Sequence, residues 1–297
     1  MKNFKYSVLF LLSCLFLLNS CLHAQDSLIK VACVGNSITA GYGLENPSLQ
    51  SYPAQLQTLF DSKKWLIKNF GVSSRTMLKT SDFPYWNEPQ YKEALTLEPD
   101  VVIIKLGTND AKRWIWNVHG KEYKNDYKEM IESFRSLSSK PEIFVCLAIT
   151  GENKGWDIYK SYIKDSLNPK IREIALEEGV NLIDLYSLFL GKEKEWLMGD
   201  SVHPTTAGSA AIAARVKESL IHNKTRITVS NGILMAPQAE AYQWYFNRKA
   251  ITAKNNGTSQ MFKPLKAGFY MVSICPSKKN ESRFISQEFL YDDDTKK

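Results

Sequence analysis

Short apolar runs alternate with longer amphipathic stretches over most of this chain. Five runs rich in β-branched and other apolar residues cover 29–34, 65–70, 101–106, 143–149 and 180–185. Several of these runs are apolar at both odd and even positions. This is typical of strands covered on both faces, because half-exposed strands alternate between apolar and polar residues. The runs therefore predict the strands of a buried sheet.

Helical periodicity fills the segments between these runs. The expected helices cover 52–60, 89–97, 122–137, 169–178 and 205–221. In the third helix, apolar residues recur at helical spacing at Tyr127, Met130 and Phe134, with lysines and glutamates on the opposite face. Gly179 follows the fourth helix as a C-cap would. The alternation predicts an open parallel sheet with helices on both faces, whose functional residues gather at the carboxyl ends of the strands.

The pattern changes after residue 225. Short aromatic and β-branched runs at 227–229, 242–246, 269–275 and 284–290 are separated by turn signals such as Asn231-Gly232. This pattern predicts a small all-β sandwich of roughly 70 residues, near the lower limit for an independent core. We therefore expect an α/β domain over residues 25–225 and a β domain over residues 226–297.

The first 24 residues have the pattern of a secretory signal peptide. Lys2 and Lys5 precede an apolar run at 8–18, which is too short to cross a membrane. Two processing sites fit this segment. Ala24 ends a stretch that resembles a signal-peptidase site, and Cys21 ends one that resembles a bacterial lipobox. Both alternatives place the protein outside the cytoplasm, as a secreted or periplasmic protein or as an outer-membrane lipoprotein.

Composition and charge are those of an ordinary globular protein with a basic C-terminal part. A hydrophobic share of 44% and a charged share of 23% exclude collagen, coiled coil and general disorder. The net charge is +7, yet residues 25–225 hold 25 basic and 25 acidic residues, whereas residues 226–297 hold 11 and 6. We expect this C-terminal excess to favour weak contact with anionic polysaccharide or an anionic cell surface. Nucleic acid is not an expected partner, because the basic residues are scattered.

The cysteines exclude two kinds of site. Beyond the signal segment only Cys33, Cys146 and Cys275 remain, each within an apolar run, so we expect buried thiols rather than a disulfide framework. No spacing of Cys and His suggests a zinc site. We expect neither a metal nor an organic cofactor.

Polar motifs follow the predicted strands at the points where the strands end. The first strand leads into GNS at 35–37, the second into NFGVS at 69–73, and the third into GTND at 107–110. The motif DSVHP at 200–204 precedes the last helix. Each motif alone is more often a turn or a helix cap. Together, in this order and at these strand ends, they indicate one composite site.

These four motifs resemble the diagnostic blocks of the SGNH hydrolases, also called the GDSL esterase and lipase family. The block residues match Ser37, Gly71, Asn109 and His203, and the acid matches Asp200. The resemblance covers about residues 28–222. It implies a three-layer α/β/α, flavodoxin-like fold and an acyl-enzyme mechanism with Ser37 as nucleophile. Within the family, stretches 70–77, 82–86 and 103–110 are similar to bacterial sialate and other carbohydrate O-acetylesterases.

The C-terminal β domain resembles a different group. Stretches 242–246 and 268–272 are similar to the small immunoglobulin-like modules appended to secreted bacterial proteins. Such a module serves as a spacer, a sugar-binding platform or an attachment device.

A serine hydroxyl becomes nucleophilic when a base takes its proton, and imidazole titrates near neutral pH. His119 fits a polar loop and His222 fits a helix end, which leaves His203 as the base. Asp200 is placed to accept a hydrogen bond from the ring of His203 and fix its tautomer. The structural alternative is that Asp200 only caps the following helix, in which case Asp184 is the next acid to consider.

The resemblance also implies an oxyanion hole. Its donors would be the backbone N–H groups of Ser37 and Gly71 and the side-chain amide of Asn109. A glycine at position 71 leaves room for the substrate carbonyl. The family has an aspartate before the nucleophile where this chain has Asn36. Since that residue mainly shapes the turn, hydrogen-bonding geometry matters more there than charge.

Aromatic and basic side chains near these motifs suggest how substrate binds. Trp86, Trp114, Trp116 and Trp156 are expected in loops on the side of the sheet that carries the nucleophile. Their ring faces suit sugar rings, although tryptophans in loops are more often packed under neighbouring segments. Arg75 either pairs with a substrate carboxylate, such as that of sialic acid, or forms a surface ion pair.

Together these features predict a serine esterase that removes O-acetyl groups from carbohydrate, with an acetylated sugar as its partner. No long apolar lid suggests access to a lipid bilayer. Two alternatives remain open. One is a lysophospholipase or thioesterase with the same site, and the other is a glycan-binding surface protein whose hydrolase site has decayed.

Overall fold

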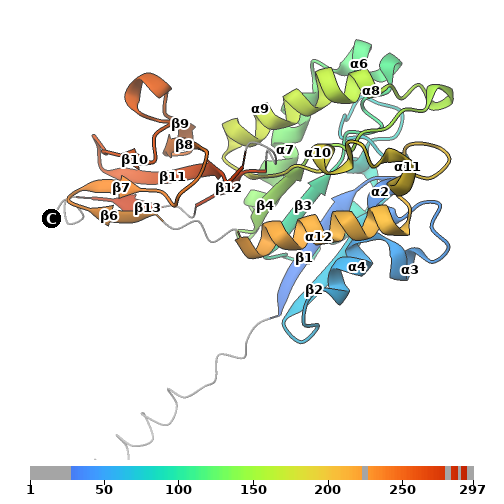
Figure 1. Ribbon diagram of the computed structural model, residues 1–297, viewed down its shortest axis with the longest axis horizontal. Helices are drawn as coiled ribbons and strands as arrows, with labels where there is room; N and C mark the ends of the chain where they lie inside the picture. Colours follow the sequence, from blue (N-terminus) through green and yellow to red (C-terminus); the bar gives the residue numbers. More distant parts are fainter. Residues whose placement is uncertain (1–27, 223–226, 278–281, 287–288, 293–297) are drawn as a thin grey trace, which may run out of the picture.

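The computed structural model describes residues 28–222, 227–277, 282–286 and 289–292. The predicted signal segment and the predicted boundary between residues 225 and 226 lie outside these ranges. The described residues form an α/β part and a separate β part, which meet at one edge of the α/β sheet (Figure 1). No helix in the described ranges combines the length and apolar character needed to cross a bilayer.

Five parallel strands form the centre of the α/β part, in the order β2-β1-β3-β4-β5. They are β1 (Ile29–Gly35), β2 (Trp65–Gly71), β3 (Val101–Lys105), β4 (Glu142–Cys146) and β5 (Asn181–Ile183). The predicted parallel sheet is confirmed. β4 ends three residues earlier than its apolar run. The Leu147 N–H still donates to the Ile183 carbonyl, but the Asn168 side chain bonds both the N–H and the carbonyl of Ala148 in place of a neighbouring strand.

Helices cover both faces of this sheet, as predicted (Figure 1). One face packs against α5 (Pro89–Thr96), α7 (Tyr123–Arg135) and α9 (Asn168–Glu178), and the other against α4 (Tyr52–Thr58) and α12 (Thr206–His222). Gly179 ends α9 in the left-handed region, with φ of 57°, and its N–H donates to the Ala175 carbonyl.

Six further α-helices are not evident from the sequence pattern. They are α2 (Ser37–Ala40), α3 (Pro47–Gln50), α6 (Arg113–His119), α8 (Lys160–Tyr162), α10 (Tyr186–Phe189) and α11 (Glu193–Trp196). None exceeds seven residues, which is less than two helical turns, so too few positions exist for a period to be recognised. A π-helical turn, η4 (Ile163–Leu167), joins α8 to α9.

The predicted C-terminal β region is also confirmed. One sheet has the order β10-β7-β6, and the other has the order β12-β11-β8-β9 with β13 on β11. The strands are β6 (Thr228–Ser230), β7 (Ile233–Met235), β8 (Ala241–Phe246), β9 (Lys249–Ala250), β10 (Met261–Phe262), β11 (Gly268–Cys275), β12 (Phe284–Ile285) and β13 (Phe289–Tyr291). Both sheets share one apolar core around Trp244, whose indole N–H donates to the Ser259 carbonyl at 2.7 Å.

The β part covers the free edge of β5. Leu182 and Arg283 exchange two backbone hydrogen bonds of 2.9 and 2.8 Å. The N–H of Ile285 donates to the Asn181 side chain at 2.6 Å, and the Ser282 hydroxyl accepts the N–H of Asp184 at 3.0 Å. An edge strand exposes unpaired backbone groups that invite aggregation. The C-terminal residues therefore satisfy the last strand of the α/β sheet.

The strand order places the predicted site. β1 lies between β2 and β3. The chain adds β2 on one side of β1 and then crosses over to add β3 on the other side, so the order in which strands are added reverses between β1 and β3. Ligands in open α/β sheets bind outside the carboxyl ends of strands at such a reversal. Ser37 follows β1 and Asn109 follows β3, one on each side of this point.

A buried lysine in the sheet leads to a prediction about stability. Lys105 ends β3 and is 1% exposed, and the described residues provide its ammonium group with neither a hydrogen bond nor an ion pair. Burial lowers the pKa of Lys105 from 10.5 to about 8. The folded state then binds fewer protons than the unfolded state between these two values, so the free energy of unfolding rises with pH through this window.

We expect Lys105→Met to raise the free energy of unfolding by about 2–3 kcal/mol at neutral pH, because the variant removes the cost of burying the charge. The gain should shrink as pH rises from about 8 towards 10.5. Urea unfolding of the wild type and of Lys105→Met across this pH range measures the gain. Lys68→Met, at an exposed position, is the matched control. If the difference in free energy of unfolding between the variant and the wild type stays constant with pH, the buried charge is not its cause.

Candidate active site

The nucleophile candidate begins a one-turn helix directly after β1. Asn36 is the N-cap of α2, and its side-chain oxygen accepts the N–H of Ile38 at 3.1 Å. This is the turn-shaping role expected of an uncharged residue at this position. Ser37 is the first helical residue and is 8% exposed, so the local sequence directs its hydroxyl to the rim of the sheet.

Ser37, His203 and Asp200 form a continuous chain of hydrogen bonds. His203 Nε2 lies 2.8 Å from Ser37 Oγ, and His203 Nδ1 lies 2.7 Å from Asp200 Oδ2. The other Asp200 oxygen accepts the backbone N–H groups of Val202 and His203, both at 2.9 Å. Burial would raise the pKa of Asp200, but these donors and the imidazole outweigh it, so its pKa lies below the ordinary value.

The two alternatives for the acid are resolved by contacts. Asp200 does not cap α12, because the Thr205 hydroxyl accepts the N–H of Gly208 at 3.1 Å and serves as the cap. Asp184 accepts the N–H of Ser187 at 2.9 Å, whereas the ring of His203 contacts Asp200. An ionised carboxylate therefore faces the imidazole from the same turn of the chain.

Two aromatic rings hold the imidazole from the sides. The Tyr42 ring lies 4.7 Å from the His203 ring, and the Trp156 ring lies 5.6 Å away in an edge contact. The Trp156 turn is tied to the site by Asn153, whose side chain accepts the Trp156 N–H and donates to the Asp200 carbonyl. The rings restrict both the tilt of the imidazole and its contact with water.

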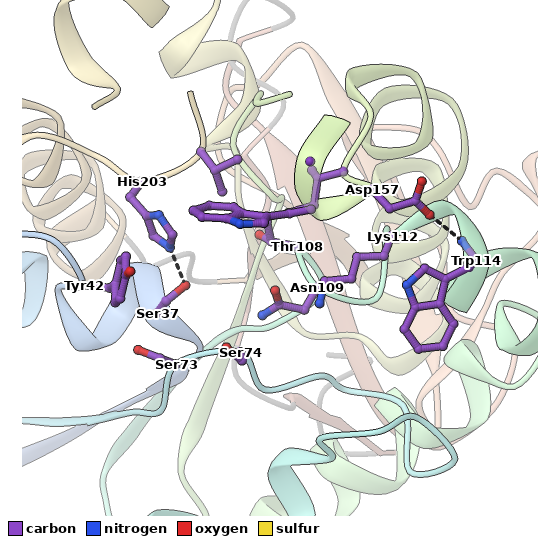
Figure 2. A pocket seen from close by; sticks show the side chains of 14 residues that line it. Ser37, Tyr42, Ser73, Ser74, Thr108, Asn109, Lys112, Trp114, Asp157 and His203 are labelled. Carbon is purple, nitrogen blue, oxygen red and sulfur yellow. Dashed lines mark hydrogen bonds between the residues drawn. The ribbon is translucent and has the colours of Figure 1, made fainter. Parts of the chain in front are cut away.

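A cavity of about 520 Å³ opens in front of Ser37 (Figure 2). Its lining residues come from the turns after β1, β2, β3 and β4 and from the turn before α12. They are Ser37, Tyr42, Ser73, Ser74, Thr108, Asn109, Lys112, Trp114, Gly155, Trp156, Asp157, Ile158, Val202 and His203. The composite site expected at the strand ends is therefore present as one cavity.

The backbone N–H of Ser37 and the amide of Asn109 are both available at this cavity. The Ser37 N–H makes no hydrogen bond within the described residues. Asn109 Nδ2 donates one hydrogen to the Arg75 carbonyl at 3.0 Å, which orients the amide and leaves its second hydrogen for a ligand. Preorganised donors of this kind stabilise the oxyanion of a tetrahedral intermediate.

The structure does not support Gly71 as the third donor. The Gly71 N–H donates to the Asn69 side chain at 2.9 Å, and Gly71 is absent from the described lining residues. A Cβ at this position would lie 2.2 Å from the Ala40 nitrogen. Glycine is therefore required here by the close approach of α2 rather than by a substrate carbonyl.

Ser74 takes this place at the cavity. Ser74 lines the cavity, and its backbone N–H has no hydrogen-bond acceptor among the described residues. Its φ of 68° lies in the left-handed region, which residues other than glycine rarely adopt and which recurs at functional sites. The only sequence signal is the pair of small residues Ser73 and Ser74 after β2.

The predicted substrate-binding residues divide into two groups. Trp114 and Trp156 line the cavity, whereas Arg75 and Trp86 do not. The Arg75 guanidinium pairs with Glu88 at 2.5 Å and lies over the Phe83 ring. The Trp86 indole donates to the Met77 carbonyl at 2.7 Å and packs against the core. Both side chains are occupied within their own loop.

The predicted loop positions of three residues need correction. Trp114, Trp116 and His119 lie in helix α6 rather than in loops. Trp116 packs against Tyr123 beneath the rim. His119 contacts the Thr80 hydroxyl at 3.1 Å and is not among the described residues that line the cavity. Helix α6 has seven residues, too few for a helical period to be recognised in the sequence.

Tyr42 and Lys112 line the cavity although no sequence motif includes them, and Thr108 lines it from within the GTND motif without a predicted role. The buried Thr108 hydroxyl has no hydrogen-bond partner among the described residues. Cys33, Cys146 and Cys275 are buried, as predicted, and form no disulfide within the described ranges. In those ranges no cluster of His, Cys, Asp or Glu could hold a metal ion.

A buried carboxylate holds the loop that carries Ser74. Asp110 is fully buried, and its two oxygens accept the N–H groups of Met77 and Leu78 at 3.0 and 2.8 Å. Burial raises the pKa of Asp110 to about 6, against the opposing effect of these donors. The carboxylate thus joins the turn after β3 to the loop after β2.

We expect Asp110→Ala to lower the free energy of unfolding by about 2–4 kcal/mol, because two buried N–H groups lose their acceptor. Esterase activity should fall as well, since the loop that presents Ser74 loses its anchor. Urea unfolding and an esterase assay measure the two effects. The exposed Asp165→Ala is the control. A change in Asp110→Ala below about 0.5 kcal/mol would contradict the anchoring role.

Comparison with known proteins agrees with this geometry. A model of the GDSL-like lipase/acylhydrolase family matches residues 33–211. An acetylxylan esterase of Xylanibacter ruminicola is 38% identical over 206 residues, which is 64% of this chain and 42% of that protein. The chain therefore spans less than half the length of that relative. A spore germination lipase, LipC, of Bacillus licheniformis is 23% identical over 208 residues, 64% of this chain and 95% of that protein.

The fold is similar to solved structures. The crystal structure of the lipase/acylhydrolase from Enterococcus faecalis matches 71% of this chain and 100% of its own, with a TM-score of 0.55 and 20% identity. This likeness concerns the fold alone. The family match covers more than half of the chain and includes Ser37, Asn109 and His203. The chain belongs to the GDSL-like lipase/acylhydrolase family.

Proposed function

We propose that this chain is a secreted serine esterase that removes O-acetyl groups from carbohydrate. The observation that carries the proposal is the hydrogen-bonded chain from Ser37 through His203 to Asp200, which opens on a mainly polar cavity. The signal-peptide pattern of residues 1–24 supports a place outside the cytoplasm.

The reaction proceeds in two halves. His203 Nε2 takes the proton of Ser37 Oγ as the oxygen attacks the ester carbonyl carbon. The carbonyl oxygen becomes an oxyanion. It accepts hydrogen bonds from the backbone N–H groups of Ser37 and Ser74 and from the side-chain amide of Asn109. The C–O bond to the sugar then breaks, and the sugar oxygen takes the proton from His203. Water, deprotonated by His203, then attacks the acetyl carbon. The bond from this carbon to Ser37 Oγ breaks, Ser37 Oγ takes the proton back from His203, and acetate leaves. Asp200 stays ionised and stabilises the imidazolium.

The cavity lining supports a small acyl group on a polar scaffold. Among the described lining residues only Ile158 and Val202 are aliphatic, too few to cover a fatty acyl chain. The exposed rings of Trp114 and Trp156 offer flat apolar faces suited to sugar rings. The relative described as an acetylxylan esterase favours a plant polysaccharide. Sialic acid is less well supported, because Arg75 is paired with Glu88.

The C-terminal β region supports a second role for the same protein. We propose that its basic excess gives weak contact with anionic polysaccharide or a cell surface, and that the region is an immunoglobulin-like module. Lipidation at Cys21 is the alternative means of attachment.

Asn109→Ala tests the oxyanion hole. We expect kcat for nitrophenyl acetate to fall by about 10²–10³, because one donor to the transition state is lost. KM should change little, since the donor acts mainly on the oxyanion. Asn117→Ala, on the exposed surface of α6, is the matched control. If kcat falls by less than about threefold, Asn109 is not a donor in the oxyanion hole.

The acyl preference separates the acetylesterase from the lipase and thioesterase alternatives. We expect kcat/KM for nitrophenyl acetate to exceed that for the octanoate by about tenfold or more, because the cavity lacks an aliphatic wall. Acetate should also be released from acetylated xylo-oligosaccharides. Ser37→Ala supplies the blank, and covalent labelling of Ser37 by a fluorophosphonate excludes a decayed site. Faster turnover of the octanoate would overturn the proposal.

A further inference from the structure

A lysine that the sequence motifs do not mark lies three residues after Asn109. Lys112 lines the cavity, and Figure 2 shows its side chain directed toward Asn109. Its backbone is held on two sides: the N–H donates to the Asn109 carbonyl at 3.2 Å, and the residue pairs with Ile158 in an antiparallel bridge. The backbone of Lys112 is thus held in a fixed position relative to Asn109, one of the oxyanion donors.

The other charged groups around the cavity have partners. Asp157 pairs with Arg113 at 3.1 Å and accepts the N–H of Trp114 at 3.0 Å. Asp200 is bound to His203. Within the described residues, the Lys112 ammonium contacts no carboxylate. The cavity therefore carries one positive charge that its own walls do not compensate.

The surroundings of Lys112 favour an anionic ligand. Lys112 is half-buried, so its charge is less screened than that of a fully exposed surface lysine. It stands beside Trp114, whose exposed ring would contact a sugar. An ammonium group is a compact point charge that does not distinguish planar from tetrahedral anions. The chemistry it fits is an anionic substituent on a sugar, either a carboxylate or a sulfate.

We propose that Lys112 selects acetylated sugars that carry an anionic group near the ester. The inference rests on the proposed carbohydrate esterase function and names its substrate class more closely. Lys112 takes the role that the sequence had suggested for Arg75, whose guanidinium is held by Glu88. Lys112 is a specificity residue here, because it contacts the substituent and not the reacting ester.

Competition against nitrophenyl acetate tests the proposal without depending on acetate release from sugars. The inhibitors are glucuronate, a sulfated glucose and glucose. We expect each anionic sugar to inhibit the wild-type enzyme about threefold to tenfold more strongly than glucose, the range of a charge-assisted hydrogen bond at a half-buried site. The difference should weaken at high salt. The two anionic inhibitors show whether a carboxylate or a sulfate fits better.

Three variants separate this role from others. In Lys112→Met the anionic and neutral sugars should inhibit equally, whereas Lys112→Arg should keep the difference. Lys154→Met is the matched control, because Lys154 is exposed and lies outside the lining residues. Equal inhibition by anionic and neutral sugars in the wild type would overturn the proposal. So would an equal loss of activity on neutral and anionic esters in Lys112→Met, which would instead place Lys112 at the oxyanion.

A second comparison separates failure of the inference from failure of the proposed function. Acetylated xylo-oligosaccharides with and without a uronic acid are compared at equal length. Acetate release from both at equal kcat/KM leaves the carbohydrate esterase function standing and rejects the anionic preference. Hydrolysis of nitrophenyl acetate without acetate release from any sugar rejects the carbohydrate function, while the competition assay still decides the role of Lys112.

Discussion

Parallel pairing of the five strands is the constraint on which the site depends. Because all strands point the same way, the turns that follow them meet at one edge of the sheet. Ser37 and His203 are 166 residues apart in the chain and 2.8 Å apart at this edge. β1 and β3 are direct neighbours, with Gly35 opposite Lys105, so the turns bearing Ser37 and Asn109 start side by side. The helices on both faces keep this alignment by burying the sheet.

Charges near the site differ in how they are compensated. The carboxylates of Asp200 and Asp110 accept hydrogen bonds from backbone N–H groups. Asp200 orients the imidazole of His203, and Asp110 holds the loop that carries Ser74. The ammonium groups of Lys105 and Lys112 have no hydrogen-bond acceptor or carboxylate partner within the described residues. The interior position of Lys105 disfavours its charge. The open cavity around Lys112 leaves the charge of its ammonium group available to a ligand.

The C-terminal β region adds to the α/β sheet at the strand farthest from β2. Backbone hydrogen bonds between Leu182 and Arg283 and the contact from Ile285 to Asn181 close an edge that would otherwise be open. The contacts lie on β5, whereas the cavity lies over β1 and β3. The described residues of the β region therefore support the sheet and do not line the active-site cavity.

Local sequence patterns predicted much of the fold and most of the catalytic residues. Apolar runs and helical periods predicted the parallel sheet and its two helical layers, because these features depend on residues close together in the chain. The motifs at the strand ends identified Ser37, Asn109, Asp200 and His203. The structure brings Ser37, Asn109 and His203 to one cavity and places Asp200 against the imidazole of His203.

Only the tertiary structure decided which groups at the rim are available. The Gly71 N–H is taken by Asn69, so the left-handed Ser74 presents its N–H instead. Arg75 is occupied by Glu88, while Lys112 remains without a carboxylate partner in the described chain. The edge contact of β5 with the C-terminal region was likewise invisible in the sequence. The physical reason is that a hydrogen bond or ion pair depends on the exact backbone conformation of a turn and on the segments that fold against it, and the order of residues records neither.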